Sequence, residues 1–111
     1  VASYYCRSSW DAAAIVARIN LAADWAARNH AAVFAGEFGA TMKLNRPARL
    51  AWLAAVRQAC ETDGIGWALW GYDDAMGFGI TRSRAPRPRL DPGVLAALGL
   101  TSANHAYHPT R

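Results

Sequence analysis

One carboxylate in an apolar setting is the residue of this sequence best suited to chemistry. Glu37 lies in the run 31–39, which reads AAVFAGEFG and is otherwise apolar. A charge at the end of such a run is costly unless the side chain faces a polar cleft or a neighbouring Arg satisfies it. In a cleft, a carboxylate can act as a nucleophile or as an acid or base. The pattern alone favours the two interpretations equally, and Gly36 and Gly39 allow a ligand or another backbone to approach closely.

Aromatic and acidic side chains follow a second apolar run. Residues 65–70 read IGWALW, and a turn rich in Gly and Asp comes directly afterwards. Trp70 offers a flat apolar ring for stacking, and the alternative is a core aromatic on a buried strand. Tyr72 and Asp73 can form hydrogen bonds to a polar ligand, although a solvated turn explains Asp73 equally well. Asp74 is expected to belong to such a turn.

Helical patterns precede both apolar runs. Ser8 and Asp11 have capping-box spacing, and an apolar face continues to residue 28, which predicts a helix over 8–28 that ends at Asn29 and His30. Asn45 as a cap, with Pro47 in the first turn and Gly64 as a stop, predicts a second helix. A short third helix is predicted between Asp91–Pro92 and Gly99.

The order helix, strand, helix, strand, short helix is typical of an α/β fold built from right-handed βα units. Runs 31–39 and 65–70 contain almost no polar residues, so we expect strands of a parallel sheet covered on both faces. In such folds the active site lies at the carboxyl ends of the strands. Glu37 and Trp70 both lie at such ends.

Length and composition indicate one domain. The chain has 111 residues, 53% of them hydrophobic and 18% charged, which favours a packed segment over a disordered one. We expect a folded part over 1–100 and a disordered tail over 101–111, where no periodicity is visible. Much of the net charge of +4 lies in residues 82–89. We interpret that Arg- and Pro-rich stretch, with Arg82, Arg84, Arg87 and Arg89, as a solvated connection rather than a nucleic-acid site.

Metal, disulfide and membrane signals are weak. Cys6 and Cys60 define neither a disulfide framework nor a metal site, and whether they pair stays open. His30, His105 and His108 lack the spacing of metal ligands. No apolar run approaches the roughly 20 residues that span a bilayer, and no secretory signal is visible.

Three strings together resemble a known family. VFAGEFGA is followed by RLAWLAAVRQACETDG and then by GIGWALWGYDDAMGF. Their order resembles the last two strand units of the cellulase-like glycoside hydrolase family 5, a (β/α)8 barrel, over about 8–99. The resemblance implies an α/β fold that is a partial TIM barrel, comprising only its last two to three βα units.

The resemblance also implies roles for individual residues. Glu37 matches the nucleophile of the family's GEFG motif, and Trp70 matches the aromatic platform beneath the sugar. Tyr72 and Asp73 would lie above the cleft, where they could bind sugar hydroxyls. The remaining tryptophans are interpreted as packing residues, namely Trp10, Trp25, Trp52 and Trp67.

The expected function is that of a glycoside hydrolase that cleaves a β-linked polysaccharide by retaining double displacement. That mechanism needs two carboxyl groups about 5–5.5 Å apart, and the family takes its acid/base from an Asn-Glu pair, a dipeptide absent from this sequence. We therefore expect 1–111 to be an inactive fragment of an enzyme. The alternative is a catalytically inactive remnant or a carbohydrate-binding piece.

The expected partners follow from this function. They are a polysaccharide or oligosaccharide substrate, with no nucleic acid, no membrane, no metal and no cofactor. Secretion is implied by the resemblance alone, because proteins of this family are commonly exported. Open barrel edges would favour self-association.

Overall fold

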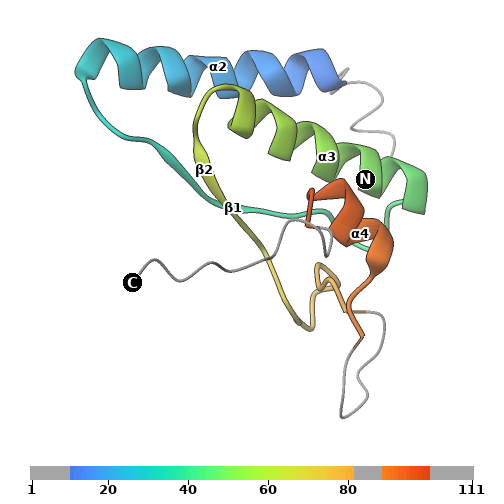
Figure 1. The fold of residues 1–111 in the computed structure, drawn as a ribbon. Coiled ribbons are helices and arrows are strands. Elements are labelled where there is room, and N and C mark those ends of the chain that lie inside the picture. The colour runs from blue at the N-terminus through green and yellow to red at the C-terminus, as the bar shows by residue number, and fades with distance from the viewer. Residues whose placement is uncertain (1–10, 82–88, 101–111) are drawn as a thin grey trace, which may run out of the picture.

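The computed structural model of the protein describes residues 11–81 and 89–100. Figure 1 shows the order of the elements along the chain. They are α2 (Ala12–Asn29), β1 (Phe34–Phe38), α3 (Arg46–Thr62), β2 (Gly66–Leu69) and α4 (Pro92–Ala97). The predicted α/β order of helix, strand, helix, strand and short helix is confirmed.

Helix α2 begins later than the sequence pattern predicts. Asp11 is its N-cap: the backbone there is extended, and the carboxylate accepts a hydrogen bond of 2.9 Å from the amide of Ala14. A cap residue lies outside the helix it caps, so the predicted start at residue 8 is wrong, and Ser8 lies outside the described residues. His30 ends the helix with a φ of 51°, which confirms the predicted end.

Helix α3 has the boundaries that its caps predict. The Asn45 side chain accepts a hydrogen bond of 2.9 Å from the amide of Ala48, and Pro47 lies in the first turn. Gly64 follows the last turn with a φ of 67°, a conformation that costs glycine little. The sequence then enters β2 without a long connection.

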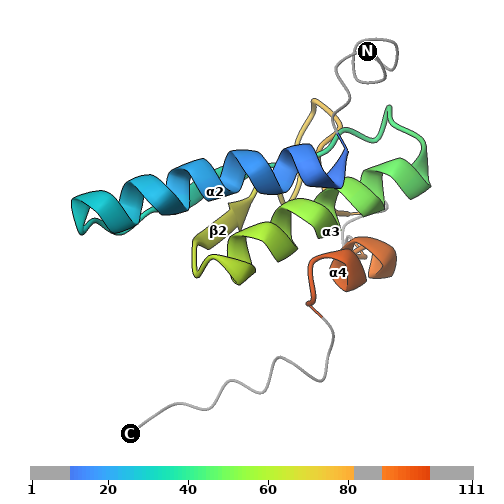
Figure 2. The same cartoon turned by 90° about the horizontal axis from the view of Figure 1, so that it is seen from above.

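Strands β1 and β2 form a parallel pair. Phe34 lies opposite Gly66, and Phe38 lies opposite Leu69, with an irregularity in the register before Phe38. The expectation that both faces would be covered is wrong for this chain: Phe34 is 62% exposed, and only Phe38 of β1 is buried. Figures 1 and 2 show why, because α2 and α3 lie side by side and pack on the same side of the pair.

The core is centred on α3, which contacts α2, α4 and β2. Its buried face carries Leu53, Val56 and Cys60, and α2 contributes Ile15. Burying these side chains together is the main source of stability for so small a unit. The other buried apolar residues are Phe38, Ala40, Ala59, Ile65, Val94 and Leu98.

The tryptophans divide into two groups. The rings of Trp52 and Trp67 pack against Phe38, with centroids 6.2 Å and 5.6 Å from its ring, which confirms their packing roles. Trp25 is 51% exposed, so its assignment to packing is wrong in this chain. Trp10 lies outside the described residues.

Helix α4 lies alongside α3 and begins and ends where the sequence predicts (Figure 2). Asp91 caps it through hydrogen bonds from Gly93 and Val94, and Gly99 follows it with a φ of 69°. The same carboxylate binds Arg46 in α3 through two bonds of 2.5 Å and 2.7 Å. That pair ties the last helix to the middle one.

Several predicted features lie beyond the described residues. They are the tail 101–111, Cys6, three of the four arginines of the Arg- and Pro-rich stretch, and two of the three histidines. Arg89 and His30 are described and exposed. In the described part of the chain, no helix combines the length and apolar character needed to cross a bilayer.

Candidate active site

Glu37 lies one residue before the carboxyl end of β1. Its side chain is exposed, in contrast to the buried Phe38 that follows it. Alternation along a strand explains this, since successive side chains point to opposite faces. Among residues 11–81 and 89–100, no side chain forms an ion pair with Glu37, so the neighbouring Arg of the structural interpretation is not found there.

Trp70 lies directly after β2, next to the end of β1. Its amide donates a hydrogen bond of 2.7 Å to the carbonyl oxygen of Phe38. The side chain is 43% exposed, and a cis peptide bond joins Trp70 to Gly71. The two strands therefore deliver a carboxylate and an indole ring to the same end of the sheet.

Gly39 lets the two strand ends approach. A Cβ atom on residue 39 would overlap the carbonyl oxygen of Trp70 and would lie 3.2 Å from the ring of Phe78. A Cβ on Gly36 would meet only the side chain of Phe34, at 3.8 Å. The predicted close approach is therefore confirmed at Gly39 as a contact between backbones, whereas no backbone of the described residues approaches Gly36 closely.

Tyr72 and Asp73 begin the loop that follows Trp70. Both are exposed, Tyr72 by 60% of its surface. Two bonds of 3.2 Å, from the amide of Ile80 to the carbonyls of Gly71 and Tyr72, close the base of the loop. These two side chains thus lie near Trp70 in the chain and are available to a ligand.

Asp74 has a structural role within the same loop. Its carboxylate accepts hydrogen bonds from the amides of Met76, at 2.6 Å, and Phe78, at 3.0 Å. The predicted turn is confirmed, although it is held from inside rather than merely solvated. The amide of Met42 also donates to the carbonyl of Gly77 at 2.8 Å, which joins this loop to the segment after β1.

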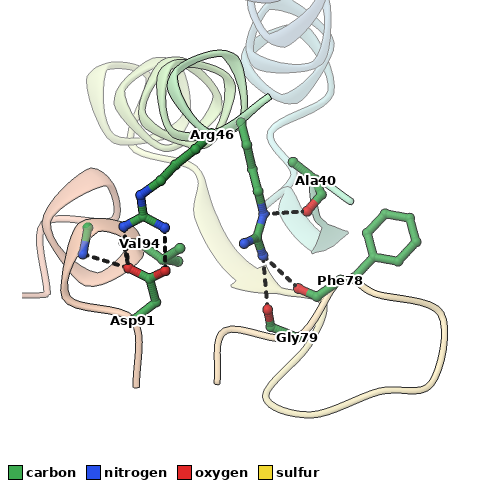
Figure 3. Close-up of polar contacts among 8 residues, drawn as sticks. Ala40, Arg46, Phe78, Gly79, Asp91 and Val94 are labelled. Atoms are coloured by element: carbon green, nitrogen blue, oxygen red, sulfur yellow. Dashed lines mark hydrogen bonds and ion pairs between the residues drawn. The ribbon is translucent and has the colours of Figure 1, made fainter. Parts of the chain in front are cut away.

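Arg49 of α3 is buried, and Figure 3 labels the residues whose carbonyls it bonds, Ala40, Phe78 and Gly79. Its Nε atom donates to the carbonyl of Ala40 at 2.8 Å, and its Nη2 atom donates to the carbonyls of Gly79, at 2.9 Å, and Phe78, at 3.2 Å. Burial lowers the pKa of Arg49, and the nearby Asp91 opposes that effect. One side chain on α3 therefore holds the segment after β1 and the loop after β2.

Arg49 was not among the residues predicted from the sequence, although its spacing along α3 indicates that it is buried. Residues 49, 53, 56 and 60 have the spacing of one helical stripe, and the last three are the apolar core face of α3. An Arg in such a stripe must find several acceptors, because an unpaired buried charge is costly. Its partners could not be named from the sequence.

Glu37 belongs neither to a metal-binding cluster of the described residues nor to the lining of the apolar cavity described next. No group of His, Cys, Asp or Glu in the described residues has an arrangement that could hold a metal. An apolar cavity of about 390 Å³ lies between the start of α2, α3 and the segment after β1. None of Glu37, Trp70, Tyr72 and Asp73 lines it. At the strand ends, the exposed groups described so far are the Glu37 carboxylate and the Trp70 ring.

Comparisons with known proteins show which family the chain resembles. The family described as Cellulase (glycosyl hydrolase family 5) matches residues 4–75. Endoglucanase 3 of Fibrobacter succinogenes (strain ATCC 19169 / S85) is 38% identical over 73 residues, which are 65% of this chain and 11% of that protein.

Solved structures agree with the family match. A hyperthermophilic endo-β-1,4-glucanase in complex with substrate is 31% identical, with a TM-score of 0.71, over 81% of this chain and 28% of its own. Thermotoga maritima Cel5A, solved with cellobiose, is 26% identical, with a TM-score of 0.69, over 79% of this chain and 27% of its own.

The extent of these matches defines what the chain contains. It spans about a quarter of each solved relative and about a tenth of the Fibrobacter protein. The relatives are TIM barrels, and the parallel strand pair with its helices corresponds to part of such a barrel. The chain belongs to glycosyl hydrolase family 5, the cellulase family, and forms part of its (β/α)8 barrel.

Proposed function

We propose that this chain is the C-terminal part of the catalytic barrel of a retaining glycoside hydrolase that cleaves a β-linked polysaccharide, with Glu37 as its nucleophile. The supporting observation is the exposed Glu37 carboxylate at the end of β1, next to the end of β2 that carries Trp70. The substrates named for the solved relatives, cellobiose and mannotriose among them, support a β-linked glycan. Export from the cell is an expectation from the family alone.

The chemistry assigns a distinct task to each side chain. The Glu37 carboxylate attacks the anomeric carbon and forms a glycosyl ester, and water then hydrolyses that ester. Trp70 supports the apolar face of the sugar ring, while Tyr72 and Asp73 bind its hydroxyls. No step of this mechanism requires a metal or cofactor.

The leaving oxygen must receive a proton from a second carboxylic acid. No residue of this chain corresponds to the family's Asn-Glu pair, and the chain spans only about a quarter of its solved relatives. We therefore assign the acid/base to a part of the barrel outside 1–111. Asp73 is assigned to substrate binding, because the resemblance gives it no role as an acid.

A chimeric barrel tests this proposal. Residues 11–100 replace the matching C-terminal segment of the Thermotoga maritima protein, so that the remainder of that barrel supplies the acid/base. We expect hydrolysis of carboxymethyl cellulose, and a decrease on the order of 10⁴-fold in kcat with Glu37→Gln. Glu61→Gln is the matched control, because Glu61 is exposed on α3 and pairs with Arg57. A folded chimera whose rate is unaffected by Glu37→Gln contradicts the proposal.

A further inference from the structure

We propose that Arg49 is a positioning residue, which fixes the loop carrying Tyr72 and Asp73 relative to the strand end carrying Glu37. This inference deepens the proposed function, on which the roles of those three side chains depend. Arg49 itself does not reach them. It acts through backbone carbonyls on both sides of the site.

The first side is the segment after β1. The carbonyl of Ala40 accepts the 2.8 Å bond from Nε of Arg49, three residues beyond Glu37. Gly39 lies between them, and a Cβ on it would overlap the carbonyl oxygen of Trp70. The bond to Ala40 therefore holds a backbone segment that is already in close contact with the end of β2.

The second side is the return of the loop after β2. The carbonyl of Gly79 accepts the 2.9 Å bond from Nη2 of Arg49. Gly79 is buried, and a Cβ on it would lie 3.4–3.5 Å from backbone atoms of Tyr72, Asp73 and Asp74. Whatever holds Gly79 thus holds the backbone from which Tyr72 and Asp73 project.

The chemistry of the guanidinium suits this task. It is a planar fork whose donors leave in fixed directions, so it can bond carbonyls on two segments at once. A Lys ammonium is a compact charge that cannot span both segments with the same geometry. Figure 3 shows the two branches diverging from one side chain toward Ala40 and toward Phe78 and Gly79.

Both segments are otherwise joined by few bonds. The amide of Met42 donates to the carbonyl of Gly77, and the amide of Trp70 donates to that of Phe38. The loop's own closure, from Ile80 to Gly71 and Tyr72, is internal to the loop. The loop return has a second anchor, because the amide of Asp91 donates a 2.8 Å bond to the carbonyl of Ile80. Arg49 differs in that one side chain of α3 bonds both segments, whereas the shape of the loop depends on Asp74.

Hydrogen exchange in the full 1–111 chain, measured by NMR without sugar, tests the inference. The reporters are the amides of Met42 and Trp70, whose bonds to the carbonyls of Gly77 and Phe38 join the two segments, and the reference amides are those of Leu95 and Leu98 in and after α4. We expect Arg49→Lys to speed exchange at the reporters at least about tenfold, with less than about a twofold change at the reference amides. The indole N–H resonance of Trp70 should shift as well.

Arg57→Lys is the matched control, because Arg57 lies two turns further along α3 and bonds Ala97 and Glu61 instead. It should leave the reporters unchanged. Unchanged exchange rates at the reporter amides of Arg49→Lys would overturn the inference. An equal increase in exchange at the reporter and reference amides would overturn it too, because a general loss of stability produces that result. Since no sugar is present, the result is independent of whether Glu37 is the nucleophile.

Discussion

The amide of Trp70 donates a 2.7 Å hydrogen bond to the carbonyl oxygen of Phe38. This bond places the first residue after β2 beside the last residue of β1, and therefore places Trp70 near Glu37, the neighbour of Phe38 in the chain. A parallel pair permits such an arrangement because the carboxyl ends of both strands meet at one edge.

The first prediction concerns Gly39. Substitution by Ala places a methyl group against the carbonyl of Trp70, so the strand ends must separate. We expect Gly39→Ala to lower the free energy of unfolding by about 1–3 kcal/mol, as measured by urea denaturation. Gly36→Ala is the control and should change it by less than about 0.5 kcal/mol, because a Cβ there has space. Equal effects at the two glycines would show that the contact does not constrain the strands.

The second prediction concerns the sugar platform. Trp70→Ala should weaken binding of cellotetraose to the chimera by about 1–2 kcal/mol, a factor of roughly 5–30, because stacking and apolar burial are lost. Calorimetric titration measures this affinity. Trp25→Ala removes an equally exposed indole from α2 and should leave the affinity unchanged. Similar losses for both variants would place the sugar elsewhere.

The third prediction concerns the attachment of α4. The Asp91 carboxylate caps this helix and also binds Arg46, and the hydrogen bond to Asp91 raises the pKa of Arg46. We expect Asp91→Ala to lower the free energy of unfolding by about 1–2 kcal/mol through the lost cap and the lost partner. Asp24→Ala, an exposed position on α2, is the control for thermal melts. No change in the melting temperature of Asp91→Ala contradicts the assigned role.

The sequence predicts helix ends better than it predicts burial. Caps act locally, so Asn45, Asp91 and Gly64 define helix ends correctly. The start of α2 was missed because Asp11 fits both the third position of a capping box and a cap itself. The prediction that Trp25 packs in the core was wrong, because helical spacing places a residue near the apolar face but does not show whether a neighbouring element covers that position.

Contacts between distant segments are harder to predict. The stripe containing residue 49 marks Arg49 as a buried charge, yet its acceptors are backbone carbonyls at residues 40, 78 and 79. Every residue has such a carbonyl, so no side-chain pattern identifies the ones that are used. Glu37 and Trp70 could be predicted as candidate site residues, because each lies at the end of a strand that the sequence pattern indicates.

The fourth prediction concerns Cys60, a buried free thiol. Burial raises its pKa, and the carboxylates of Asp63 and Glu61 add to that effect. The native chain therefore holds less thiolate at Cys60 than an unfolded chain at the same pH, and alkylation by iodoacetamide should be at least about 100-fold slower. The rate is read at Cys60 by mass spectrometry, with urea as the control. Equal rates with and without urea contradict the assigned burial.

The same shift has a consequence for stability. A thiol whose pKa is raised in the folded state contributes fully at pH values below the pKa of the unfolded thiol, about 8.5. That contribution is lost as the pH rises through the higher native pKa. Cys60→Ser should therefore flatten the decrease in unfolding free energy at alkaline pH, and an unchanged slope would argue against the shift.

The fifth prediction concerns the chain by itself. With one placed carboxylate and no acid/base, 1–111 should release no measurable reducing sugar from β-glucan. Clear turnover that is abolished by Glu37→Gln would contradict this prediction, and Asp73→Asn would then be the next variant to assay.

The most direct test of the central claim is to trap the covalent intermediate in the chimeric barrel. A 2-deoxy-2-fluoro-β-cellobioside with a dinitrophenolate leaving group needs no protonation to react, and the fluorine slows hydrolysis of the resulting ester. Peptide mass spectrometry then locates the sugar. We predict one added 2-fluorocellobiosyl group on Glu37, absent from Glu37→Gln and present in Glu61→Gln. A sugar carried by any other residue, or an adduct that persists in Glu37→Gln, would contradict the assignment of Glu37 as the nucleophile.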